Sequence, residues 1–185
     1  VVPPKVAPTH VVILPVTPKE ETRVQVLEAC DQLSKELRDQ EFAGGSIRVE
    51  IDDRDLRGGE KYWSWVKKGI PLTIEIGPRD LENGTVFVGR RDHGSKRKGM
   101  ERQALVDGVT NILEEMQANL FARALAFREE NTVTIDSKEE LYAYFTPQNK
   151  SKPEMHGGFA LVHWDRDPQW EEQLKNDLKV TVRCI

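Results

Sequence analysis

The chain has 185 residues, of which 31% are charged and 38% are apolar, and its formal net charge is −4. This composition is typical of a globular protein, and no stretch approaches the roughly 20 consecutive apolar residues of a membrane-spanning helix. The N-terminal sequence VVPPKVAPTH has no initiator Met, no basic segment and no apolar segment, so we expect a cytoplasmic protein without a secretory signal and a chain cut from something longer.

The first 52 residues predict a strand, a helix and a second strand. The continuous apolar run His10–Val16 is typical of a strand that is buried on both faces. A helix should follow, with apolar residues at helical spacing that include Cys30, which we expect in the core. The alternating sequence SIRVEID (Ser46–Asp52) then predicts a second strand. A strand–helix–strand unit of this kind usually joins two parallel strands.

The middle of the chain predicts a short aromatic helix between further strands. We expect this helix from about Gly59 to Lys68, because Gly69 and Pro71 favour its end there. Strands should cover Leu72–Ile76 and Thr85–Arg91, antiparallel to each other across a turn at Asn83-Gly84. The segment Asp92–Gly99 is interpreted as a basic loop.

A long helix from about Met100 to Glu130 should close the first domain. We therefore divide the chain into residues 1–131 and 132–185. The first domain is predicted to be α/β, with a mixed, mostly parallel sheet surrounded by helices. The second is predicted to be a small α+β domain, with a helix that begins at a capping box formed by Ser137 and Glu140, a helix over Asp167–Asp177, and strands before and after the latter.

Charge is distributed unevenly, and the common catalytic motifs are absent from the sequence. Between Arg54 and Arg102 there are 12 Lys or Arg residues and 7 Asp or Glu residues, whereas the rest of the chain has a net negative charge. The sequence contains no P-loop, GxSxG or GxGxxG motif, and its four histidines lack metal-ligand spacing. The chain by itself therefore does not indicate an enzyme.

Polar residues alternate with apolar ones along two of the predicted strands. Those on the polar faces are Arg48, Glu50, Asp52, Thr73 and Glu75. One interpretation is a solvated sheet edge. The other is RNA recognition, because a carboxylate can accept from the N1–H and amine of an unpaired guanine while Arg or Lys donates to its O6 and N7.

Three segments together resemble prolyl-tRNA synthetase. They are PPKVAPTHVVILPV, RVEIDDRDLRGGEKYWSWVKKGIPLTIEIGPRDLENGTVFVGRRD and ANLFARALAFREENT. The similarity covers nearly the whole chain and is to the C-terminal half of the archaeal- and eukaryotic-like form. It implies a class IIa anticodon-binding domain followed by the small C-terminal domain of that form. It also implies that the catalytic domain, which uses ATP and Mg²⁺, lies outside this chain.

The same resemblance implies a partner and a set of RNA-binding residues. The partner is the anticodon stem-loop of tRNA(Pro), and the full-length enzyme is expected to be a homodimer with no membrane contact. The residues carried over are Asp55, Arg57, Lys61, Glu75 and Arg79, of which we expect Glu75 and Lys61 to matter most. For Arg79 a local ion pair with Asp80 remains an equal alternative.

One segment departs from the family pattern, in which the small domain often binds zinc through four cysteines. In His163–Trp170 two of the cysteine positions hold Asp165 and Trp170. Trp cannot bind a metal, and structural zinc requires thiolates or imidazoles. We therefore expect no zinc and no other cofactor in this chain, and we expect Trp170 to pack where the metal would lie.

Two other functions stay open from the sequence. The same fold can serve as an interaction or dimerisation module without RNA binding. Alternatively, the chain can be the anticodon domain of a related synthetase for glycine, threonine or histidine.

Overall fold

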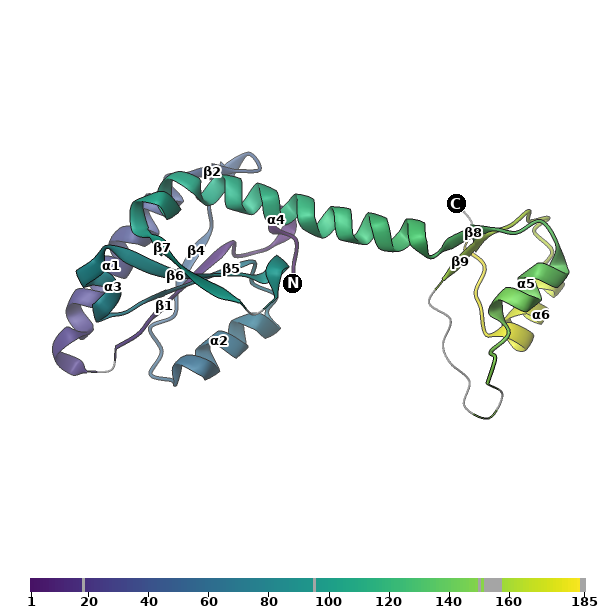
Figure 1. The fold of residues 1–185 in the computed structure, drawn as a ribbon, viewed down its shortest axis with the longest axis horizontal. Coiled ribbons are helices and arrows are strands. Elements are labelled where there is room, and N and C mark those ends of the chain that lie inside the picture. The colour runs from purple at the N-terminus through teal and green to yellow at the C-terminus, as the bar shows by residue number, and fades with distance from the viewer. Residues whose placement is uncertain (18, 95, 150, 152–157, 184–185) are drawn as a thin grey trace. The chain divides into compact units, whose positions relative to one another are not determined.

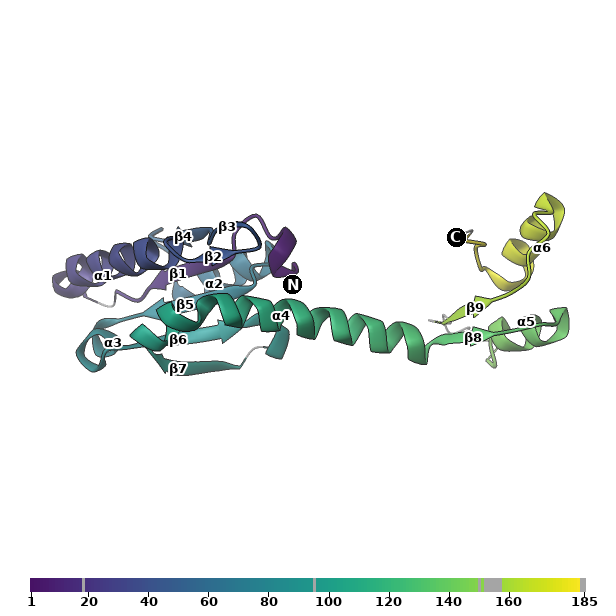
Figure 2. The ribbon, with the colours of Figure 1, turned by 90° about the horizontal axis from the view of Figure 1, so that it is seen from above.

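The computed structural model describes residues 1–17, 19–94, 96–149, 151 and 158–183, and Figures 1 and 2 show it from two directions. The chain divides into two compact units, Val1–Ala122 and Arg123–Ile185. The sequence instead put the boundary after residue 131, at the end of the long helix α4 (Arg102–Glu130). The division falls inside α4, after its last buried residue, Met116, and after Asn119, which still donates to Asp92 Oδ2 at 2.9 Å.

The first unit is built on a five-stranded sheet with the strand order β4-β1-β5-β6-β7. Its strands are β1 (Val11–Pro15), β4 (Val49–Ile51), β5 (Leu72–Ile76), β6 (Thr85–Arg90) and β7 (Arg97–Glu101). The strands β4, β1 and β5 are parallel, whereas β6 and β7 each pair antiparallel with their neighbours. The α/β fold class, with a mixed sheet surrounded by helices, is thereby confirmed.

Helices cover the two faces of this sheet unequally. The helices α1 (Glu20–Arg38) and α4 pack on one face, and α2 (Gly58–Lys67) packs on the other, as Figure 1 shows. A short helix, α3 (Pro78–Asn83), connects β5 to β6. Two 3₁₀ turns, Pro4–Val6 and Arg91–His93, complete the helical elements described in this unit.

Successive side chains along the strands point to opposite faces of the sheet and pack into two separate hydrophobic cores. On β1, Val11 and Ile13 join the large core under α1 and α4, whereas Val12 and Leu14 join a smaller core under α2. All five residues of β1 are buried, as the continuous apolar run predicted. Cys30 is buried in the large core, where the loss of hydration is the main cause that raises its thiol pKa to about 12.

The elements of the first unit that the sequence analysis missed include β7 and α3. The segment interpreted as a basic loop, Asp92–Gly99, overlaps the start of β7, whose residues are mostly exposed. An edge strand pairs on one side only and tolerates charged residues, so it carries no apolar alternation to detect. The turn predicted between β5 and β6 is α3, which Asp80 caps by accepting from the backbone N–H of Gly77 at 2.8 Å.

A small hairpin follows α1, where the sequence predicted only the end of the helix. It pairs β2 (Glu41–Phe42) with β3 (Gly45–Ser46). The two residues between these strands, Ala43 and Gly44, both have positive φ values, of 53° and 82°. This is the backbone conformation that two-residue hairpin turns require.

The second unit contains two short parallel strands and two helices. They are β8 (Thr132–Thr134), β9 (Phe159–Leu161), α5 (Lys138–Phe145) and α6 (Pro168–Leu178). The Ser137 hydroxyl accepts from the backbone N–H of Glu140 at 3.2 Å, as expected for the predicted cap. The strand β8 was not predicted. The strand predicted at the end of the chain is not formed over residues 179–183, and residues 184 and 185 lie outside the described residues.

Candidate nucleic-acid interface

Part of the α2 face of the sheet carries side chains that no helix buries. Glu75 on β5 lies directly opposite Phe87 on β6, and Phe87 lies opposite Gly99 on β7. The side chain of Glu75 is 22% exposed, and Phe87 is 39% exposed. Because α2 packs on β1 through Val12 and Leu14, it leaves the β5–β7 part of this face open to solvent.

Arg97 on β7 connects these residues into one surface. Its guanidinium forms an ion pair with the Glu75 carboxylate and lies 5.0 Å from the ring centroid of Tyr62 and 5.9 Å from that of Phe87. We name Tyr62, Glu75, Phe87 and Arg97 the Glu75 cluster. It joins an acceptor, a donor and two aromatic rings contributed by β5, β6, β7 and α2.

A glycine on β6 makes room for Arg97 to cross the sheet. Gly89 pairs with Arg97 on one side and with Thr73 on the other. A Cβ on Gly89 would stand 2.5 Å from Thr73 Oγ1 and 3.0 Å from Arg97 Cγ. Only glycine therefore allows the arginine stem to lie flat across this strand.

A buried carboxylate organises the chain between β4 and α2, where two predicted RNA contacts lie. Asp52, 3% exposed, accepts from Trp65 Nε1 at 2.8 Å and from Arg54 Nε and Nη2 at 2.7 and 2.6 Å. Arg54 also donates to Ser64 Oγ at 2.8 Å. The hydrogen bond from Arg54 is the main reason that the pKa of Asp52 is lowered to about 2, and it outweighs the opposing effect of burial.

Three of the predicted residues are exposed near this end of the sheet. Asp55 and Arg57 lie on the segment that leads into α2, and Arg79 lies in the first turn of α3. The backbone N–H of Arg57 donates to Glu60 Oε2 at 3.2 Å, which fixes the start of α2. No ion pair between Arg79 and Asp80 is found among the described residues, because Asp80 caps α3 instead.

Lys61 is where the structure departs most from the sequence prediction. It is only 5% exposed, so its ammonium cannot reach a base from this position. The reason is the rotation of α2 about its axis, which turns Lys61 inward together with its neighbours Tyr62 and Trp65. Glu75, by contrast, pairs with Arg97 and keeps part of its carboxylate in solvent.

The sequence analysis assigned no RNA contact to three members of the Glu75 cluster, Tyr62, Phe87 and Arg97. Phe87 carried a usable signal, because it lies between Val86 and Val88 on an alternating strand and must face away from them. Arg97 carried none, since it stood in a segment interpreted as a loop.

The candidate metal position in the second unit holds an aromatic cluster. Trp170 stacks on Tyr142 at 6.2 Å between ring centroids, and the Lys138 ammonium lies 4.1 Å from the Trp170 centroid. Among the described residues no group of three or more metal-ligating side chains is found. Likewise, no helix in the described ranges is sufficiently long and apolar to cross a bilayer.

Comparison with known proteins finds a family match for the region that contains the Glu75 cluster. Residues 10–112, from β1 into α4, match the family described as "Anticodon binding domain". The whole chain is 50% identical to proline–tRNA ligase 2 of Anaeromyxobacter dehalogenans, of which it spans 37%. It is 48% identical to the proline–tRNA ligases of Protochlamydia amoebophila, over 99% of this chain, and of Bdellovibrio bacteriovorus, over 100%, and it spans 36% of each.

The chain thus spans little more than a third of the length of these relatives. The family match covers the complete five-stranded sheet together with α1, α2 and α3, which is more than half of the chain. The open β5–β7 face and its mixed donors and acceptors lie inside that match. The chain belongs to the anticodon-binding domain family.

Proposed function

We propose that this chain recognises the anticodon of tRNA(Pro) as part of a proline–tRNA ligase. The complete enzyme would activate proline with ATP and Mg²⁺ in a catalytic domain outside this chain, and the 185-residue chain alone would not catalyse aminoacylation. The observation that carries the proposal is the Glu75–Arg97 pair, which stands beside the exposed ring of Phe87 within the anticodon-binding match.

The Glu75 cluster offers the hydrogen-bonding complement of guanine. Guanine presents two adjacent donors, N1–H and the exocyclic amine, next to one acceptor, O6. Cytosine satisfies that edge with two acceptors and one donor. Glu75 supplies the two acceptor oxygens and Arg97 supplies the donor, and their ion pair holds the two groups side by side. Phe87 supplies a ring on which the base can stack.

The remaining predicted residues have different roles in this proposal. Asp55, Arg57 and Arg79 are exposed and remain candidate contacts to bases or phosphates. Lys61 is assigned no contact, because α2 would have to rotate to expose its ammonium. The basic balance of residues 54–102 favours a polyanionic partner, so binding should weaken as salt rises.

Inosine provides a test at the level of single atoms, because it is guanine without the exocyclic amine. Binding of the chain to an anticodon stem-loop with UGG is compared with binding to stem-loops that carry inosine at each guanine in turn. At the guanine that Glu75 contacts, inosine should weaken wild-type binding by roughly tenfold. Glu75→Gln should bind less tightly and lose that discrimination.

Glu82→Gln is the matched control, since it removes one carboxylate from the exposed side of the neighbouring helix α3. It should bind like the wild type and keep the inosine effect. Equal, weak binding of all stem-loops by the wild type would refute RNA decoding and favour an interaction or dimerisation module. Preference for an anticodon of glycine, threonine or histidine tRNA would redirect the proposal to those synthetases.

Finer features of the complete protein are also proposed. The order of the units, with a small domain after the anticodon-binding one, supports the archaeal- and eukaryotic-like form, although the relatives compared are bacterial. We propose a cytoplasmic homodimer, which sedimentation of the full-length enzyme would test.

We also propose that the second unit holds no zinc, because Trp170 and Lys138 form a cation–π contact beside Asp165 and Asp167. Metal analysis of the dialysed chain should therefore find no bound zinc. One equivalent of zinc per chain would contradict this proposal.

A further inference from the structure

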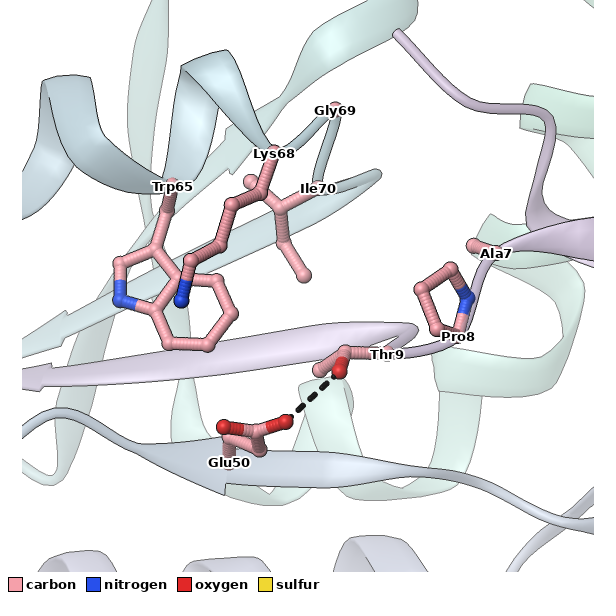
Figure 3. A pocket seen from close by; sticks show the side chains of 8 residues that line it. All are labelled: Ala7, Pro8, Thr9, Glu50, Trp65, Lys68, Gly69 and Ile70. Carbon is pink, nitrogen blue, oxygen red and sulfur yellow. Dashed lines mark hydrogen bonds between the residues drawn. The ribbon is translucent and has the colours of Figure 1, made fainter.

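A polar cavity lies at the C-terminal end of α2. The cavity has a volume of about 210 Å³, is open to solvent, and is lined by the segment before β1, by β4 and by the end of α2. Figure 3 shows its lining residues, among them Thr9, Glu50, Trp65, Lys68 and Ile70. Neither the anticodon-binding match nor the Glu75 cluster assigns this cavity a role.

The cavity has one negative and one positive group that do not neutralise each other. Glu50 Oε1 accepts from Thr9 Oγ1 at 2.9 Å, which fixes the carboxylate at the β4 wall. The Lys68 ammonium lies 4.0 Å from the Trp65 ring centroid, on the α2 wall. Within the part of the chain that the structure describes, neither Glu50 nor Lys68 forms an ion pair with any residue.

Apolar surface completes the lining between these two charges. Trp65 and Ile70 are almost completely buried, and the exposed Pro8 stands at the rim. The volume is below the roughly 300–1,000 Å³ typical of pockets for drug-sized ligands, so the occupant must be smaller. A simple cation would be repelled by Lys68, and a simple anion would be repelled by Glu50.

We propose that this cavity binds a small α-amino acid with an apolar side chain, as its zwitterion. The ammonium group of the ligand donates to Glu50, its carboxylate accepts from Lys68, and its side chain packs on Trp65 and Ile70. The dipolar ligand satisfies both charges at once, which neither half of the molecule can do. The site is independent of RNA recognition, so it stands or falls separately from the function proposed above.

L-Valine and its two halves test this site without altering the protein. Isobutylamine keeps the valine side chain and the ammonium group, and 3-methylbutanoate keeps the side chain and the carboxylate. Each is titrated into the ¹⁵N-labelled chain while the indole N–H signal of Trp65 and the backbone signals of the lining residues are followed. Valine should bind with a dissociation constant of about 1 mM, as expected for a ligand of so few atoms.

Each half-molecule should bind roughly tenfold or more weakly than valine, because it forms only one of the two charge-assisted contacts that valine makes with the exposed side chains of Glu50 and Lys68. Glu50→Gln and Lys68→Met should each weaken valine binding by a similar factor. Lys67→Met removes the same charge from the adjacent residue, which is exposed like Lys68 but lies outside the lining, and should bind valine like the wild type. Equal binding of valine and its halves, equal loss in Lys67→Met and Lys68→Met, or shifts away from the lining residues would each overturn the proposal.

Discussion

The two faces of the five-stranded sheet differ in how completely helices cover them. One face lies under α1 and α4 and forms the large core, to which all five strands contribute buried or partly buried apolar side chains. The other face lies under α2 alone, and its core is limited to Val12, Leu14, Tyr62, Trp65 and Ile70 with Val66 packed against them. Glu75, Phe87 and Arg97 of the Glu75 cluster lie where α2 leaves this second face open, and Tyr62 contacts Arg97 from α2.

Strand β5 contributes side chains to both faces of the sheet. Leu72, Ile74 and Ile76 point into the large core, while Thr73 and Glu75 point to the other side. The face covered by α1 and α4, here called the closed face, supplies most of the hydrophobic core. The face under α2, here called the open face, keeps exposed side chains that can contact a partner. Substitutions on the two faces should therefore affect different properties.

The largest effect on stability is expected from removing a buried side chain on the closed face. Ile74→Ala removes a fully buried side chain and should lower the free energy of unfolding by about 2–5 kcal/mol, because the cavity cannot collapse completely. Chemical denaturation measures this loss. If Ile74→Ala lost RNA binding while its stability stayed unchanged, the assignment of roles to the two faces would be wrong.

A smaller, pH-dependent effect on stability is expected at Asp52, which connects the end of β4 to Trp65 on α2. The pKa of Asp52 in the folded chain is about 2, below its usual value of 3.8. A lowered folded-state pKa stabilises the fold above pH 4, and this contribution, about 2 kcal/mol, is lost as the pH falls from about 4 to about 2. The stability difference between the wild type and Asp52→Asn should therefore shrink over that range.

Denaturation curves of both proteins between neutral pH and pH 2 check this expectation. Asp53→Asn, which removes an exposed neighbouring carboxylate, is the matched control. A difference between wild type and Asp52→Asn that stays constant with pH would show that the Arg54 and Trp65 contacts do not favour the charged carboxylate.

The smallest effect is expected on the open face, and it should appear in binding rather than in stability. Phe87→Ala removes a ring that is partly exposed, so it should weaken binding of the anticodon stem-loop by about 1 kcal/mol through lost stacking. Its unfolding free energy should change much less than that of Ile74→Ala. Fluorescence anisotropy with a labelled stem-loop measures the binding, and Phe87→Tyr, which keeps the ring, should restore it.

Local sequence patterns predicted four of the five strands of the main sheet but not β7 at one of its edges. The period-two alternation of Leu72–Ile76 identified β5 correctly and separated Glu75 from Ile74. The same approach failed for β7, because an exposed edge strand needs no apolar alternation. It also failed for Lys61, because helical spacing places residues relative to one another but does not determine which side of α2 faces the sheet.

The sequence by itself therefore determined the long helices α1 and α4, the buried strand β1, and that Glu75 lies on a polar side of its strand. Only the tertiary structure decided that Arg97, 22 residues further along the chain, pairs with Glu75 and that Lys61 is buried. The physical reason is the distance along the sequence over which each kind of interaction acts. Backbone periodicity acts over a few neighbouring residues, whereas the Glu75 cluster depends on the lateral order of β5, β6 and β7 and on how α2 packs across them.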